Sequence, residues 1–400
     1  MLTRSLVSKL FETSTMQRWT DHARPVPFTI LGKHAHMVTA AWVYGRSLEM
    51  QLEPPTINWT KLVDYAVYEL LRKAVLTDIK SQVFRDLNKD ESSRQALLGY
   101  VQGSLREDLT AVSPASFDGF VQYFDAEIDD PDSLGLEYKL LRCASNYATR
   151  WEYQIISEVD KVKYITDTRR ALDDEKAQYG KFLPKEVDDL EPDKLAKFLD
   201  LCGRLRFQDR WSQTPIVPRR PVMDHQLVVA TLAHLSTRQL KIGDARTYNN
   251  FFGALFHDLG EILTRDIVSP IKNISSEVKR VIDDFEKTQY DKHIDTLVPQ
   301  KWRPELRRMV LNPFVQDIDY DGEFVKACDT FAAFLEAYYS VKYGTYSPEL
   351  KKALLYLYES RRKRGPIRPR ADHEDSIDPM TFDVAYELCF YEIEPQIRRI

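Results

Sequence analysis

The chain has 400 residues, of which 43% are hydrophobic and 29% are charged, and its formal net charge is −5. This length is too great for one ordinary hydrophobic core and predicts more than one domain. The net negative charge excludes a global attraction to nucleic acid or to an anionic membrane. The sequence contains no run of about 18 apolar residues, so we expect no membrane-spanning helix.

The composition also bears on compartment and fold class. The first residues contain no long apolar segment of the kind found in a secretory signal. The four cysteines form no Cys-x-x-Cys pair, and we expect reduced thiols in a cytoplasmic protein. Only 14 residues are glycine, and long segments are rich in Leu, Lys, Glu and Arg, which favours helix. We therefore predict an all-α fold.

In chain order, apolar periodicity predicts helices in the first 160 residues, at 6–18, 34–48, 62–76, 86–112 and 136–156. A highly charged, helix-forming stretch follows and is expected to be a surface connector. Apolar periodicity then resumes up to about residue 345. We predict a first domain at 1–160, a connector at 161–200, a second domain at 201–345 and a helical extension at 346–400.

The order of features in the first domain recurs in the second at an offset near 190 residues. An Arg-Trp dipeptide at 18–19, a proline-rich loop and an apolar helix from Lys33 come first. An Arg-Trp dipeptide at 210–211, a proline-rich loop and an apolar helix from Met223 follow later. Matches that keep both order and spacing predict a tandem duplication of one helical domain.

Ionisable residues interrupt an apolar helix in the segment NFFGALFHDLGEILTRDIVSPIK, which begins at Asn250. His257 and Asp258 lie on its apolar stripe, with Glu261 one turn later and Asp266 just beyond the helix. Such groups are destabilising in a core unless they are compensated, and a metal ion is the simplest compensator. A core hydrogen bond is the alternative explanation for a single His-Asp pair.

The first copy lacks these groups when the two copies are aligned by sequence. Leu70-Leu71 align with the His-Asp pair, Ala74 aligns with Glu261, and Ser145 aligns with Asp329. The apolar scaffold therefore persists while the ionisable groups are lost. This contrast favours chemistry in the second copy, although a structural core residue could diverge in the same way.

Four residues of the second copy form a candidate metal site, namely His225, His257, Asp258 and Asp329. Two imidazoles and two carboxylates suit Mn²⁺, Co²⁺, Fe²⁺, Zn²⁺ or Mg²⁺. The set contains no thiolate, which argues against a structural zinc site. A divalent ion is therefore the predicted cofactor, with its identity open.

The order His, His-Asp, Asp on helices resembles the HD-domain metal-dependent phosphohydrolase superfamily. Arg-Trp at 210–211, His225 fifteen residues later, HDLGEILTRDIVSPIK and VKACDTFAAFLEA are together similar to its bacterial 5′-deoxynucleotidase branch. The similarity covers about residues 204–345, and a degenerate version covers about 10–160. It implies an intact HD domain that follows a degenerate copy.

The resemblance also implies roles for individual residues. The four candidate ligands match metal ligands, and Glu261 matches an acid that orients or deprotonates the attacking water. Asp266 and Arg210 match groups that hold the sugar and phosphate of a nucleoside monophosphate, and Trp211 matches a residue beside that pocket. Lys272 would add positive charge, or would be an ordinary solvated lysine.

The function expected from this similarity is hydrolysis of the 5′-phosphate of a nucleotide. The alternatives are hydrolysis of a nucleoside triphosphate or signalling nucleotide, and a metal or nucleotide sensor without turnover. A basic run at 361–370 is either a solvated loop or a contact for nucleic acid. Relatives of this type are commonly homodimers, so we expect either a homodimer or a single chain in which the degenerate copy replaces the second subunit.

Overall fold

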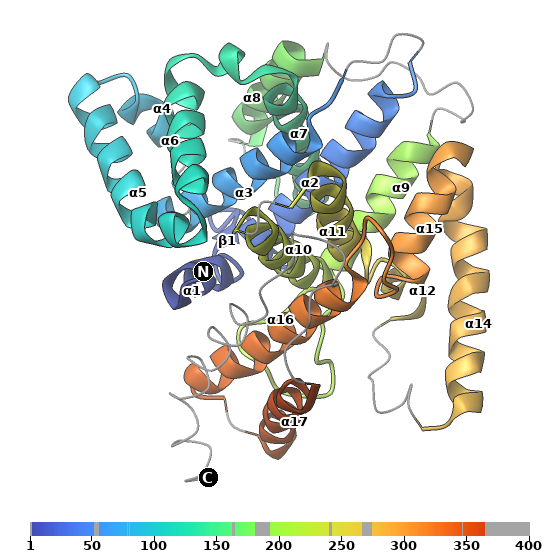
Figure 1. Cartoon of the computed structure of the whole chain (residues 1–400). Helices are drawn as coiled ribbons and strands as arrows, with labels where there is room; N and C mark the ends of the chain where they lie inside the picture. The colour runs from blue at the N-terminus through green and yellow to red at the C-terminus, as the bar shows by residue number, and fades with distance from the viewer. Residues whose placement is uncertain are drawn as a thin grey trace.

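The computed structural model describes residues 2–51, 56–77, 79, 81–161, 165–180, 193–239, 242–265, 274–345 and 347–364. Within these ranges the predicted all-α fold is confirmed (Figure 1). Strand pairing there is limited to the two-residue strands β1 (Gln17–Arg18) and β2 (Phe28–Thr29), which are antiparallel. The described helices include none that is long and apolar enough to cross a membrane.

Helices are present at each predicted segment of the first half, but the helix expected at 6–18 ends at Glu12, and the 16-residue helix at 114–129 was not predicted. The helices of the first half are α1 (Arg4–Glu12), α2 (Ile30–Leu48), α3 (Trp59–Leu76), α4 (Ser81–Leu87), α5 (Glu91–Val112), α6 (Pro114–Asp129), the 3₁₀ turn η1 (Pro131–Leu134), α7 (Gly135–Val159) and α8 (Ile165–Tyr179). Helices α5 and α6 form a hairpin at one edge of the molecule (Figure 1).

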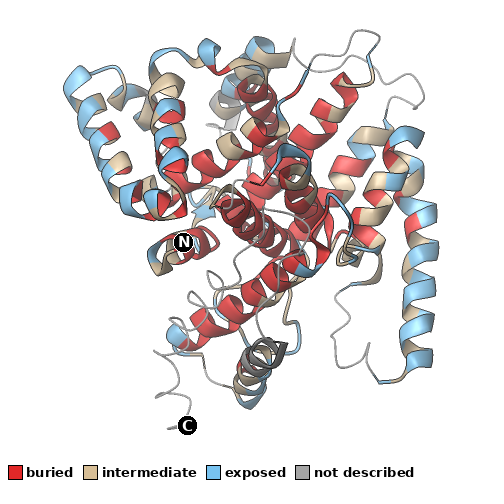
Figure 2. Ribbon diagram, in the orientation of Figure 1, coloured by how far each residue is buried: buried red, intermediate tan, exposed pale blue. Residues whose placement is uncertain are grey.

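The second half begins with the short helix α9, which packs on α2 of the first half. Its elements are α9 (Lys194–Gly203), η3 (Arg204–Arg206), α10 (Val222–Gln239), α11 (Asp244–Phe256), α12 (Glu261–Thr264), α14 (Ser276–His293), η4 (Asp295–Leu297), η5 (Gln300–Trp302), α15 (Arg303–Leu311), α16 (Gly322–Lys342) and α17 (Pro348–Arg364). Helix α14 lies at the opposite edge and is largely exposed (Figure 2).

Helices α2 and α10 lie at the centre because each is apolar around almost its whole circumference. Such a helix cannot leave one face in water and must be covered on all sides. Nearly every residue of both helices is buried, as the red ribbons at the centre of Figure 2 show. Helix α2 packs against α7 and α10, and α10 packs against α11 and α16. The side chains of α10, α11 and α16 therefore meet in the interior of the second half.

The starts of α2 and α10 are joined by one shared cap. Thr29 caps α2 by accepting a hydrogen bond from the Gly32 amide (2.9 Å), and its hydroxyl donates to Asp224 in the first turn of α10 (2.9 Å). A Cβ on Gly32 would lie 2.6 Å from an oxygen of Asp224, so only glycine permits this approach. The contact fixes the first turn of α10 against the first half, directly beside His225.

Candidate metal centre

His225 projects from α10 toward two carboxylates of α16. Its Nδ1 lies 3.0 Å from Glu336 Oε1, and its Nε2 lies 3.0 Å from Asp329 Oδ1. Asp329 and Glu336 are seven residues apart, which places both on one face of α16. If Nδ1–H donates to Glu336, the lone pair of Nε2 points toward Asp329, which is the arrangement typical of a histidine that binds a metal.

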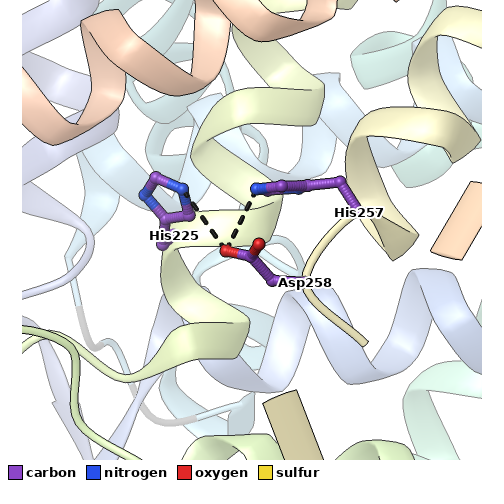
Figure 3. A group of neighbouring side chains, drawn as sticks. All are labelled: His225, His257 and Asp258. Atoms are coloured by element: carbon purple, nitrogen blue, oxygen red, sulfur yellow. Dashed lines mark ion pairs between the residues drawn. The ribbon is translucent and has the colours of Figure 1, made fainter. Parts of the chain in front are cut away.

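His257 and Asp258 approach the same point from the end of α11. The helix ends at Phe256, and the Nδ1–H of His257 donates to the carbonyl of Ala254 (2.7 Å). This leaves His257 Nε2 facing Asp258 Oδ2 at 3.1 Å and Asp329 Oδ1 at 3.8 Å. Figure 3 shows His225 and His257 on either side of the Asp258 carboxylate.

These atoms are close enough to bind one ion together. One ligand atom from each of His225, His257 and Asp258 can be chosen so that all three lie within 4.8 Å of one another. His257 Nε2 is buried and makes no hydrogen bond of good geometry, so it is available as a ligand. The contacts of Asp329 with both imidazoles place it in the same group. The structure thus brings together all four residues expected to bind a metal, and they form a candidate site for a divalent ion.

The Arg-Trp dipeptide lies over this cluster in the loop before α10. The Arg210 guanidinium donates to Asp258 Oδ2 (2.9 Å) and lies 3.4 Å from Glu336 Oε2. The indole N–H of Trp211 donates to the same Glu336 oxygen (2.7 Å), and Trp211 has a φ of 60°. A non-glycine residue in this region of φ is uncommon and is maintained here by its partners. Both residues therefore lie beside the cluster, as expected from the sequence.

Burial and charge act in opposite directions on the ionisable groups. Burial lowers the pKa of His257, but the carboxylates of Asp258 and Asp329 outweigh it and raise this pKa to about 10. Burial raises the pKa of Asp258, but His257 and Arg210 hold it below its usual range. Burial likewise raises the pKa of Glu336, yet Arg210 and His225 bring it to about 2. The carboxylates are therefore ionised, and their negative field favours a cation between them.

Glu261 begins α12, one turn beyond Asp258, and its amide donates to the carbonyl of Asp258 (3.1 Å). Its charge interacts with that of Arg210, so it lies on the same side of the cluster. Lys326 of α16 adds a cation beside Asp329 (2.6 Å). Two further residues predicted at the site, Asp266 and Lys272, lie outside the described part of the chain.

Sequence reasoning missed Glu336, a buried carboxylate that joins His225 to the Arg-Trp dipeptide. It receives hydrogen bonds or ion pairs from His225, Arg210 and Trp211 and is 2% exposed. A signal was present in the sequence, because an acidic residue stands two helical turns from Asp329 in an otherwise apolar helix. A buried carboxylate requires cationic or hydrogen-bonding partners, which the Arg-Trp dipeptide and His225 supply.

Comparison with known proteins identifies this part of the chain. Residues 197–355 match the family model described as 5′-deoxynucleotidase YfbR-like. A 5′-deoxynucleotidase of Vibrio vulnificus is 25% identical over 199 residues, which is 49% of this chain and 97% of that protein. The 5′-deoxynucleotidase YfbR of Escherichia coli is 28% identical over 149 residues, which is 36% of this chain and 72% of that protein. Residues 197–355 are therefore similar to the 5′-deoxynucleotidases of this family.

The matched segment contains every residue of the cluster described above. A crystal structure of an HD-domain phosphohydrolase from Listeria innocua is also similar, with a TM-score of 0.37 and 15% identity. That similarity covers 52% of this chain and 90% of the Listeria chain. The family resemblance predicted from the sequence motifs is confirmed, and so is the prediction that the protein is a hydrolase of phosphate esters.

Proposed function

We propose that the HD domain hydrolyses the 5′-phosphate of a nucleoside or deoxynucleoside monophosphate, with one divalent ion held by His225, His257, Asp258 and Asp329. The observation that carries the proposal is the convergence of two imidazoles and two carboxylates within a segment similar to 5′-deoxynucleotidases. A bound divalent ion would polarise a phosphoryl oxygen and lower the pKa of water. The field that raises the pKa of His257 also favours replacement of its proton by a metal ion.

The chain's own residues have distinct tasks in this proposal. Glu336 fixes the ring of His225 through Nδ1 and anchors both Arg210 and Trp211. Arg210 places a positive charge beside Asp258, where a dianionic phosphate would need it. Glu261 orients or deprotonates water from one turn beyond Asp258. Asp266 and Lys272 remain predictions for substrate contact.

Two imidazoles among the ligands favour a transition ion such as Mn²⁺, Co²⁺, Fe²⁺ or Zn²⁺ over Mg²⁺. The carboxylates at the site are paired with cations only in part. Arg210 contacts Asp258 and Glu336, and Lys326 contacts Asp329. A divalent cation between Asp258 and Asp329 would add the positive charge that these carboxylates attract.

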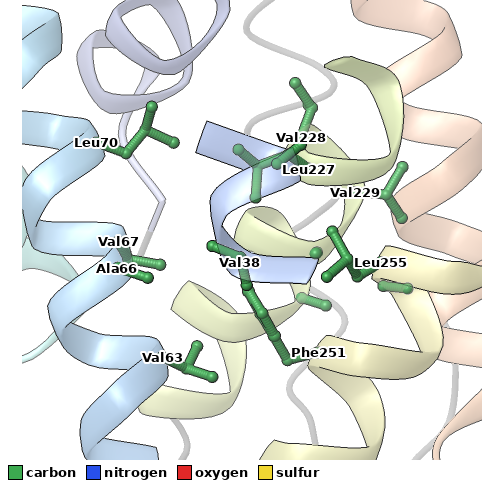
Figure 4. Close-up of a cluster of buried hydrophobic side chains, with 14 of the residues drawn as sticks. Val38, Val63, Ala66, Val67, Leu70, Leu227, Val228, Val229, Phe251 and Leu255 are labelled. Atoms are coloured by element: carbon green, nitrogen blue, oxygen red, sulfur yellow. The ribbon is translucent and has the colours of Figure 1, made fainter. Parts of the chain in front are cut away.

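The first half is proposed to replace a second subunit, so that one chain forms a pseudo-dimer. Figure 4 shows apolar side chains of both halves packed together, including Val38 and Val63 from the first and Leu227 and Phe251 from the second. Polar contacts join the same elements, such as the Thr29–Asp224 hydrogen bond beside His225. We expect turnover at a mass of one chain in solution, and activity confined to a dimer would contradict this.

Phosphate release from a panel of nucleotides tests the proposed activity. Chelator-stripped protein is supplied with Mn²⁺, Co²⁺ or Mg²⁺ and with ribo- and deoxynucleoside monophosphates, triphosphates and cyclic nucleotides. We expect metal-dependent release from the 5′-monophosphates. Release from triphosphates or cyclic nucleotides alone would identify the alternative substrate class. Tight metal binding without release from any nucleotide would indicate a sensor or a regulator, with the basic run at 361–370, most of it outside the described residues, as the candidate nucleic-acid contact.

A further inference from the structure

A second polar cluster lies in the first half and repeats the framework of the metal centre. Arg18 Nε and Trp19 Nε1 both donate to Glu152 Oε2, at 3.0 and 2.6 Å. The Arg-Trp dipeptide of the second half contacts Glu336 in the same way, and the two tryptophans have φ values of 59° and 60°. The Arg-Trp-Glu contacts of the two halves therefore correspond to each other. Other residues of the two halves can be aligned by counting from them.

When residues are aligned by their distance from the Arg-Trp dipeptides, Lys33 is the residue that corresponds to His225. Lys33 follows Arg18 by fifteen residues, as His225 follows Arg210, and α2 and α10 begin at corresponding positions. The sequence alignment that paired Lys33 with Met223 was therefore displaced by two residues. Lys33 Nζ donates to Ser145 Oγ (2.5 Å), which corresponds to the contact of His225 Nε2 with Asp329.

The end of α3 supplies two more matches. Thr77 and Arg265 each follow the last residue of a helix and have a φ near 60°. Counting back eight residues from each places Glu69 opposite His257, one residue from the sequence alignment with Leu70. Lys73 then stands opposite Glu261, and it forms an ion pair with Glu69 (2.6 Å). The first copy has thus exchanged its ionisable groups rather than lost them.

Summed over eight corresponding positions, the exchange changes the sign of the net charge. In the second half these are Arg210, His225, His257, Asp258, Glu261, Lys326, Asp329 and Glu336. In the first half they are, in the same order, Arg18, Lys33, Glu69, Leu70, Lys73, Arg142, Ser145 and Glu152. Four cations and two carboxylates leave two positive charges in the first half, where the second half has two negative charges. Two flanking groups of opposite sign, Arg206 on Glu152 and Glu175 on Arg142, leave this balance unchanged.

Lys33 is the least compensated of these cations. It is 3% exposed, and its contacts within the described residues are Ser145 and the sulfur of Met37, with no carboxylate at ion-pair distance. Burial lowers the pKa of Lys33 and repulsion from Lys73 lowers it further, while the more distant Glu69 carboxylate raises it in part. An ammonium group buried in this way is costly unless an anion accompanies it. The side chains of Lys73 and Arg18 are partly exposed, at 23% and 19%.

We propose that the cluster of Lys33, Lys73 and Ser145 binds a phosphate dianion without a metal ion. Lysine binds phosphate as a compact point charge, and the serine hydroxyl adds a neutral donor. The two excess positive charges match the charge of a phosphate monoester and repel a divalent cation. The ligand is either free phosphate, which the proposed reaction would release, or the phosphate group of a nucleotide. The site is separate from the metal centre and does not depend on the substrate proposed above.

Calorimetric titration of chelator-stripped, full-length protein with inorganic phosphate, and separately with AMP and dAMP, tests this site. Wild-type protein is expected to bind one equivalent. Lys33→Met should weaken binding on the order of tenfold or more, since a buried charged partner is removed. Lys73 is more exposed, and Lys73→Met should also weaken phosphate binding. If Lys33→Met does not fold, the phosphate affinity of Lys73→Met tests the proposal. Tighter binding of AMP or dAMP than of phosphate would identify a nucleotide ligand, and equal binding would identify phosphate.

Two control variants test whether binding depends on this cluster. Lys279→Met removes an exposed lysine paired with Asp283 in the second half, and Lys89→Met removes an exposed lysine paired with Asp86 in the first half. Both control variants should bind inorganic phosphate as wild type does. The proposal is overturned if metal-free wild type shows no binding, if Lys33→Met and Lys73→Met both retain full affinity, or if the control variants lose as much affinity as they do.

Discussion

Asp258→Asn is expected to abolish both metal binding and nucleotide hydrolysis. Asp258 is the carboxylate shared by the cluster, since Oδ2 lies 3.1 Å from His257 Nε2, 3.8 Å from His225 Nε2 and 2.9 Å from Arg210. An amide keeps the size of the side chain but removes its charge. The loss of several kcal/mol of transition-state stabilisation would lower turnover by on the order of a thousandfold or more.

Asp283→Asn is the matched control for that variant. Asp283 makes an exposed ion pair with Lys279 on α14, the helix at the edge of the molecule (Figure 2). An exposed pair of this kind contributes little to stability, and the variant should behave as wild type. Normal turnover and normal metal content in Asp258→Asn would show that the cluster neither binds the metal ion nor takes part in hydrolysis.

The second large effect is a loss of metal affinity on substitution of Glu336. The same substitution at Glu152, the corresponding residue of the first half, provides the comparison. Glu336→Gln should lower metal affinity by about 10- to 100-fold, because Gln cannot hold the His225 ring and the Arg210 guanidinium as a carboxylate does. Glu152→Gln should leave metal affinity unchanged and act on stability alone. Metal affinity is measured by competition with a chelator, and stability by denaturant unfolding.

The stability effect at Glu152 has a defined pH dependence. Burial raises the pKa of Glu152, but Arg18 and Arg206 outweigh it and bring this pKa to about 2. The folded-state pKa therefore lies below the value of roughly 4.3 for an unfolded chain, which corresponds to about 3 kcal/mol of stabilisation. That stabilisation is present above about pH 4 and is lost as the pH falls toward 2. Equal loss of metal affinity in Glu152→Gln and Glu336→Gln would contradict the assignment of the metal to the second half alone.

The sequence predicted the helices and the metal cluster for one physical reason. Polar side chains such as His225 and Asp329 interrupt helices that are otherwise apolar, and such interruptions are visible without a structure. The structure contains these helices and places the four candidate residues close together, while their role as metal ligands stays a prediction. The family comparison then confirms the kind of enzyme that the motifs indicated.

What the sequence did not reveal depends on how loops and helix ends meet. Glu336 acquires its importance only when the loop with Arg210 and Trp211 folds over α16. The correspondence of Lys33 with His225 was missed because the two apolar helices were matched with Lys33 opposite Met223, although Lys33 and His225 each follow the arginine of an Arg-Trp dipeptide by fifteen residues. The equal backbone angles of Trp19 and Trp211 support the use of these dipeptides as fixed points.

The account predicts a single divalent ion, held in the second half of the chain. Titration of chelator-stripped protein with Mn²⁺ or Co²⁺, with metal content and nucleotide hydrolysis followed together and Asp258→Asn measured in parallel, tests this most directly. Activity in wild type should rise with added metal and reach its plateau at one equivalent per chain, while the variant stays inactive. Full activity in stripped protein, or a plateau at two equivalents per chain, would contradict the account.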